Sequence, residues 1–97
     1  MFFCKTYEDE KDFLVAICDK NLLGEELPFK EIIFKVEESF YGNKLHNENQ
    51  IKNIMRKATV INAVGNNIVD LLLKEGFIEE NKIIKIGDTL HAQMAKI

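Results

Sequence analysis

The sequence predicts an α+β fold. We expect an N-terminal β-hairpin and further strands in a mostly antiparallel sheet, two central helices on one face, and a C-terminal β-hairpin. Three observations predict it: a strand-like segment near each end of the chain and a middle part with helical periodicity. Strands and helices that occupy separate parts of a chain are typical of α+β proteins. At 97 residues, the chain is predicted to form one domain over residues 1–97.

The first hairpin is predicted from "MFFCKTY" (1–7) and "DFLVAICD" (12–19), which flank the polar "EDEK" (8–11). Both flanks are rich in aromatic and β-branched residues, which favour strands. Residues 13–18 are apolar at every position. This pattern is typical of an inner strand that is covered on both faces.

The two cysteines fall in this hairpin. If Tyr7 faces Asp12, then Cys4 pairs with Val15, and Cys4 and Cys18 point to opposite faces of the sheet. Thiols that point apart cannot form a disulfide without backbone movement. We therefore expect two reduced and buried cysteines.

The segment "KNLLGEELPFKE" is predicted to be a connector, because Gly24 and Pro28 interrupt it. "EIIFKVE" (31–37) is predicted to be a strand. Its apolar face consists of Ile32, Phe34 and Val36. A turn is expected at Gly42 and Asn43, since both residue types tolerate a positive φ.

The first helix is predicted to begin at a capping box, with Asn47 at the cap and Gln50 three residues later. The segment "ENQIKNIMRKA" follows with an apolar stripe at helical spacing. The stripe consists of Ile51, Ile54, Met55 and Ala58.

The next segment, "TVINAVGNNIVDLLLKEG", also has apolar residues at helical spacing. These residues are Ile61, Val64, Ile68, Leu71 and Leu72. Gly65 lies in the middle, where glycine weakens a helix. Two helices that meet near Gly65 and one bent helix therefore both stay open. Gly76 suits the position just beyond the helix end, with Phe77 closing back on the last turn.

The C-terminal hairpin is predicted from "KIIKI" (82–86) and "TLHAQMA" (89–95), joined by a two-residue turn at Gly87 and Asp88. Strand alternation places His91 and Gln93 on one face.

The register of this hairpin pairs Ile86 with Thr89 and Ile84 with His91. His91 therefore shares its face with two isoleucines, which a purely solvated face would not normally carry. We expect this face to be half covered. A histidine in such a place is either hydrogen-bonded to backbone as a structural residue or available to bind a partner.

Composition and motifs exclude several classes of protein. A net charge of −3 argues against a whole-surface attraction to nucleic acid or anionic lipid. No apolar run approaches the roughly 20 residues of a membrane span, and "MFFC" is too short for a signal peptide. We expect a cytoplasmic protein that does not bind membranes.

The motifs do not predict an enzyme. The sequence has no phosphate loop, no G-x-G-x-x-G and no G-x-S-x-G motif, so we expect no cofactor. A zinc site would need four side chains to converge from separate segments without a C-x-x-C motif, and we predict no metal site. Those side chains are Cys4, Cys18, His46 and His91.

One charged feature differs from the rest of this acidic chain. Basic residues collect between positions 44 and 57, against Glu48 alone: Lys44, Lys52, Arg56 and Lys57, with His46. Lys52 and Arg56 lie four residues apart, on the side of the predicted helix away from its apolar stripe. This surface is either an ordinary solvated helix face or a footprint for a phosphate backbone.

Three motifs, "FYGNKL" (40–45), "ATVINAVGNNIV" (58–69) and "IIKIGDTLHAQ" (83–93), together with the early "VAICDKNLLG", resemble a family of small archaeal proteins defined by a domain of unknown function. The resemblance covers nearly the whole chain. The family pattern contains FYGG, AN-VG-E and G-V-P-H-A-Q. In this chain Asn43 replaces the second glycine, Asn66 lies near the acidic position, and Asp88-Thr89-Leu90 stands where Val-Pro would be.

The resemblance implies a set of site residues: Tyr41, Gly42, Asn62, Gly65, His91 and Gln93. It implies no established activity, but a small archaeal protein of this kind suggests work around RNA or translation. We therefore expect a non-catalytic module that binds RNA or a ribonucleoprotein. Its phosphate contacts would be Lys44, Lys52, Arg56 and Lys57, and Tyr41, His91 and Gln93 would contact a base or a partner loop.

Two alternatives stay open. The first is a protein-interaction adaptor that uses an exposed strand edge or the helix pair. The second is a small-ligand or catalytic site built on Tyr41, Asn62, His91 and Gln93. The sequence does not indicate an oligomeric state.

Overall fold

The computed structural model describes residues 1–96. The strands in this range are β1 (Phe2–Glu8), β2 (Phe13–Asp19), β3 (Glu26–Phe29), β4 (Ile32–Lys35), β5 (Leu45–His46), β6 (Val60–Val64), β7 (Ile83–Ile86) and β8 (Thr89–Ala95). The helices are α1 (Glu38–Tyr41), α2 (Glu48–Met55) and α3 (Asn66–Lys74), with short 3₁₀ turns η1 (Lys20–Leu22) and η2 (Glu80–Lys82).

Six strands form one sheet in the order β5-β1-β2-β6-β8-β7, and β3 and β4 form a separate two-stranded sheet. Within the large sheet β2 and β6 run parallel, and the other neighbours are antiparallel. The predicted α+β fold with a mostly antiparallel sheet is therefore confirmed. Within residues 1–96 no helix is both long enough and apolar enough to cross a lipid bilayer.

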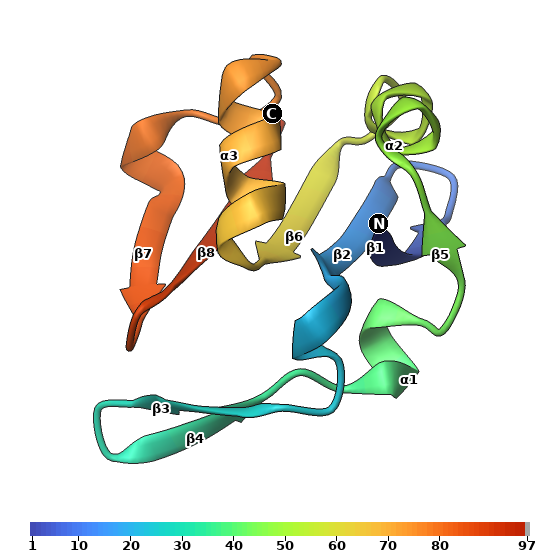
Figure 1. Ribbon diagram of the computed structural model, residues 1–97. Helices are drawn as coiled ribbons and strands as arrows, with labels where there is room; N and C mark the ends of the chain where they lie inside the picture. The colour runs from blue at the N-terminus through green and yellow to red at the C-terminus, as the bar shows by residue number, and fades with distance from the viewer. Residues whose placement is uncertain (97) are drawn as a thin grey trace.

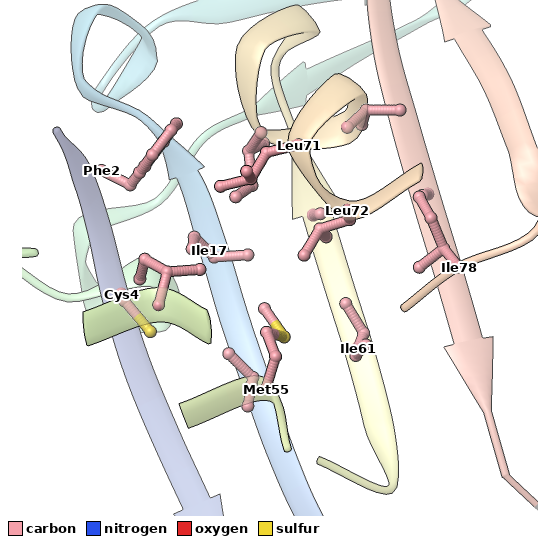
Figure 2. Packing of buried hydrophobic residues seen from close by; sticks show 14 of the residues in the cluster. Phe2, Cys4, Ile17, Met55, Ile61, Leu71, Leu72 and Ile78 are labelled. Atoms are coloured by element: carbon pink, nitrogen blue, oxygen red, sulfur yellow. The ribbon is translucent and has the colours of Figure 1, made fainter. Parts of the chain in front are cut away.

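Helices α2 and α3 pack on one face of the large sheet, which we call the helix-covered face (Figure 1). Its core joins strand residues such as Ile17 and Ile61 to helix residues such as Met55 and Leu72 (Figure 2). The opposite face, which we call the hairpin face, is covered by α1 and by the β3–β4 hairpin. The buried residues there are Ala16, Cys18, Val36, Tyr41 and Val64.

The ends of the two long helices follow the local sequence signals. The capping box of α2 is confirmed, because the Gln50 amide donates to Asn47 Oδ1 at 2.9 Å and the Asn47 amide donates to Gln50 Oε1 at 2.8 Å. Helix α3 ends at Lys74, and Gly76 lies just beyond the helix end, as predicted, with φ of 77°. The Phe77 amide then donates back to the Leu72 carbonyl at 2.8 Å.

The prediction that the helix around Gly65 extends over residues 59–64 is wrong. Residues 60–64 form strand β6, which lies in the middle of the sheet between β2 and β8. Val60, Ile61 and Val64 are β-branched, and a central position in the sheet supplies strand partners on both sides. The helix begins only after Gly65, so neither two helices nor one bent helix describes this segment.

The connector between β2 and β4 contains a strand that was not predicted. Its second half forms β3, which pairs with β4 and includes Pro28 in an edge strand. Strand β4 does not join the main sheet. Its predicted apolar face is correct for Phe34 and Val36, but Ile32 is 61% exposed. A short helix, α1, replaces the predicted break just before the turn at Gly42, where φ is 82°.

The predicted register of the N-terminal hairpin is wrong by two residues, since Cys4 pairs with Ile17 and Tyr7 with Leu14. Side chains alternate with a period of two, so this offset leaves every residue on its predicted face. Cys4 and Cys18 are free, buried and on opposite faces, as expected. Burial raises the pKa of each thiol to about 12. The predicted register of the C-terminal hairpin, with Ile84 opposite His91, is confirmed.

One buried carboxylate joins the sheet to α3. Asp19, at the end of β2, accepts hydrogen bonds from the backbone amides of Asn67 at 3.0 Å and Ile68 at 2.8 Å. It therefore caps the amino end of a helix that begins 47 residues later in the chain. Burial raises the pKa of Asp19, and these two hydrogen bonds oppose that rise.

Candidate functional site

A pocket of about 420 Å³ opens on the hairpin face, between the β3–β4 hairpin and the C-terminal hairpin. Its apolar lining consists of Phe29, Ile32, Phe34, Ile84 and Ile86. Its polar lining consists of Asn81, Lys82, His91 and Gln93. Strand alternation explains this mixture, because β7 and β8 both turn alternate residues toward the hairpin face.

His91 lies on the lining of this pocket with only 4% of its surface exposed. Phe34 packs edge-on against the imidazole, with 5.4 Å between ring centroids. The face is therefore covered more fully than the sequence indicated, and the cover comes from β4. The histidine is not a solvated residue of a terminal strand.

The Nε2 atom of His91 is buried and has no hydrogen-bond partner among residues 1–96. A buried polar atom left in this state costs about 1–3 kcal/mol, and folded proteins seldom keep one without a reason. Burial also lowers the pKa of His91, which keeps the imidazole neutral near neutral pH. A neutral imidazole nitrogen either donates or accepts one hydrogen bond, depending on the tautomer.

A second pocket, of about 500 Å³, adjoins the first and shares Lys82 and Gln93 with it. The rest of its lining is Leu14, Val60, Ile61, Asn62, Met94 and Ala95. We call the two pockets together the groove. Two apolar hollows thus meet at a polar rim that carries an amide and an ammonium group.

Tyr41 is hydrogen-bonded to Asn62, a polar residue on the lining of the second pocket. Its hydroxyl donates to Asn62 Oδ1 at 2.7 Å, and the tyrosine is only 2% exposed. Burial raises the pKa of Tyr41, so the hydroxyl keeps its proton and remains a donor. This bond uses the oxygen of Asn62, a residue that lines the second pocket, and leaves its amide nitrogen as a donor.

Four of the predicted site residues are therefore brought together. Asn62 and Gln93 are direct partners across β6 and β8, and His91 lies two residues before Gln93 on the same face. Tyr41 joins them through Asn62. Gly65 directly follows the other end of β6, where a side chain would collide with the Asp19 carboxylate.

Gly42 does not belong to this group. An added Cβ there would lie 3.0 Å from Lys5 Cβ and 3.2 Å from the Cys4 carbonyl oxygen. The glycine therefore lets the chain pass close to the edge of β1. It lines a different pocket, together with Lys44.

The predicted phosphate-contacting residues lie on α2 or in the loops beside it, but their surroundings differ. Lys52 faces α3, with its Nζ atom 3.8 Å from Glu75 Oε1. Arg56 donates to Asn53 on its own helix at 2.9 Å. Lys44 lines the pocket beside Gly42, and Lys57 is exposed just beyond α2.

The Nε2 atom of His91 is enclosed, and the hydroxyl of Tyr41 is already donated to Asn62. The sequence missed Phe29, Phe34 and Lys82 as lining residues. It contained no local signal for them, because they reach the groove through the packing of two hairpins that lie far apart in the chain.

Comparison with known proteins adds a family and a fold. The family described as "Protein of unknown function (DUF424)" matches residues 6–97. The structure is similar to the crystal structure of an uncharacterized conserved protein from Methanopyrus kandleri, with a TM-score of 0.81 and 25% sequence identity. That match covers 99% of this chain and 93% of the other. A search of curated proteins found no match.

Proposed function

We propose that this chain, which belongs to the family of proteins of unknown function DUF424, is a non-catalytic adaptor that binds a partner protein in its groove. The observation that carries the proposal is a mostly apolar pocket lined by His91, a residue whose buried Nε2 atom has no hydrogen-bond partner among residues 1–96. Stability alone does not favour such a histidine, whereas a binding site uses polar groups of this kind to orient its ligand.

The shape of the groove supports an extended segment as the bound element. In an extended chain, alternate side chains point the same way and lie about 7 Å apart. Two apolar side chains at alternate positions would enter the two pockets, and the backbone between them would cross the rim. Gln93 on that rim offers both a donor and an acceptor to a peptide backbone.

Exposed aliphatic side chains on the lining of the first pocket also support the binding of a partner protein. Ile32 is 61% exposed and Ile84 is 49% exposed, and both line the pocket. Large apolar residues that gather at the mouth of a pocket are typical of interaction sites. Burying such a side chain contributes about 1.5–3 kcal/mol when it becomes fully covered.

RNA, the partner expected from the sequence, is ranked second. Binding to a phosphate backbone needs several cations along one path. Of the four expected cations, Lys52 faces Glu75 and Lys44 lies in a separate pocket. An RNA arm in the experiment below compares the two classes of partner.

The test is selection from a displayed library of short random peptides, followed by measurement of the affinity of the selected peptides for this protein. We expect peptides with apolar residues at alternate positions. Ile32→Ser should weaken their binding, because Ile32 lines the first pocket. Ile33→Ser is the matched control, since Ile33 is 60% exposed on the same strand but does not line that pocket.

Both substitutions are on the surface and should change the free energy of unfolding by less than about 0.5 kcal/mol. Equal effects of the two variants on peptide affinity would contradict the groove as the binding site. Binding of single-stranded RNA that weakens as salt rises, without any selected peptide, would favour the second-ranked partner.

A further inference from the structure

A separate pocket beside the turn at Gly42 has a different chemistry from the groove. With a volume of about 610 Å³, it lies between α1, β5 and the edge of β1. We propose that this pocket binds a phosphate-bearing ligand with a flat apolar part, which is the chemistry of a nucleotide. This inference does not depend on the proposed function, because it concerns other residues in another part of the fold.

Basic side chains from two strands and the loop between α1 and β5 converge on this pocket: Lys5 from β1, Lys44 from the loop and His46 from β5. Glu38 opposes them as the acidic residue of the lining. The whole chain has 16 acidic and 13 basic residues. A local excess of basic groups is thus not a consequence of composition, and it favours an anion.

Two of these basic groups are held in place by the fold. The Lys5 ammonium donates to the Ser39 carbonyl at 3.2 Å, which ties it to α1 and leaves two of its three protons for a ligand. Nδ1 of His46 lies 3.0 Å from the Lys44 carbonyl oxygen, so this nitrogen is the donor and the bond orients the ring. Groups that are already positioned lose little entropy when an anion binds.

Neutral donors and an apolar wall complete the pocket. Thr6, Ser39 and Asn43 also line the pocket, and their hydroxyl and amide groups are of types that can donate to a phosphate oxygen. Phe13 and Ile54 form an apolar part of the wall. An aromatic ring beside basic groups is a common arrangement for holding a base next to its phosphate.

Gly42 shapes the same pocket, which gives this glycine a role that the groove does not explain. Any side chain at Gly42 would press on Lys5 Cβ and on the Cys4 carbonyl. Alanine there would also strain a backbone whose φ is 82°. The close approach at Gly42 therefore places the loop that carries Lys44 beside Lys5 of β1.

The test is an NMR titration of the isotope-labelled protein with AMP, inorganic phosphate, adenosine and a single-stranded oligouridylate at low salt. We expect AMP to shift the amide signals of Thr6, Lys44 and His46, and adenosine to shift them much less. Lys44→Gln should weaken AMP binding by about tenfold, because it removes one charge-assisted contact. Lys57→Gln is the matched control, since Lys57 is also exposed but does not line the pocket.

The titrations with AMP and with the oligouridylate distinguish a free nucleotide from a nucleotide within RNA. Tighter binding of the oligouridylate than of AMP identifies an RNA nucleotide as the ligand, and equal or weaker binding identifies a free nucleotide. Absence of shifts at the pocket with all four probes would overturn the proposal. Equal losses in Lys44→Gln and Lys57→Gln would also overturn it, since they would mean diffuse attraction to the surface.

Discussion

The two faces of the six-stranded sheet are made by the same strands but differ in what covers them. On the helix-covered face, β8 presents Leu90, Ala92 and Met94 to a largely apolar core beneath α2 and α3. On the hairpin face, the same strand presents His91 and Gln93 to a cover made of one short helix and a two-stranded hairpin. One face is built for stability, whereas the other retains polar groups that stability alone does not favour.

The largest effect should come from the helix-covered face. Leu72 is fully buried there between α3 and the sheet (Figure 2). Leu72→Ala should lower the free energy of unfolding in urea by about 2–5 kcal/mol, because it leaves a cavity in the main core. The affinity of the folded variant for groove-selected peptides should not change. A loss below about 1 kcal/mol would contradict the assignment of the main core to the helix-covered face.

A second prediction concerns the joint between the sheet and α3. An added Cβ at Gly65 would lie 2.3 Å from the Asp19 carboxyl carbon, and φ there is 129°. Gly65→Ala should cost about 1–3 kcal/mol from backbone strain alone, with the collision in addition. The control is Gly24→Ala, where φ is 84° and no heavy atom lies within 4 Å of the added Cβ. Equal losses of stability in thermal unfolding of the two variants would mean that the collision with Asp19 adds no cost.

The pH dependence of stability should report on the hairpin face. Burial lowers the pKa of His91, so the unfolded chain takes up this proton at a higher pH than the folded protein does. Stability should therefore fall as the pH is lowered from the ordinary histidine value of about 6.5 toward the lowered value, with a slope of at most about 1.4 kcal/mol per pH unit. The His91→Leu variant should lack this contribution to the slope of stability against pH. Identical slopes in the variant and the unmodified protein would contradict a neutral, buried imidazole at His91.

Local patterns in the sequence were enough to predict both terminal hairpins. The Gly87-Asp88 turn fixed the register of β7 and β8, and that register placed Ile84 beside His91. The capping box at Asn47 fixed the start of α2 in the same way. Each of these features depends on residues a few positions apart, whose geometry the chain determines locally.

Features that depend on distant contacts were not predictable in this way. Ile61 and Val64 fit the helical spacing of the segment that follows, yet they lie in a strand because β2 and β8 pair with them. Asp19 acts as a helix cap only because β2 ends beside α3. The polar row of Asn62, Gln93 and His91 needed both the strand at residues 60–64 and the hairpin that covers it.

The most direct test of the difference between the two faces is the stability and peptide affinity of His91→Leu. Leucine has a similar size and removes the buried nitrogen, which has no hydrogen-bond partner among residues 1–96. We predict that the free energy of unfolding rises by about 1 kcal/mol, because the cost of that nitrogen disappears, while the affinity for groove-selected peptides falls. A loss of about 1–3 kcal/mol with unchanged affinity would contradict the account, since it would make His91 a structural residue whose ring is satisfied in the folded protein.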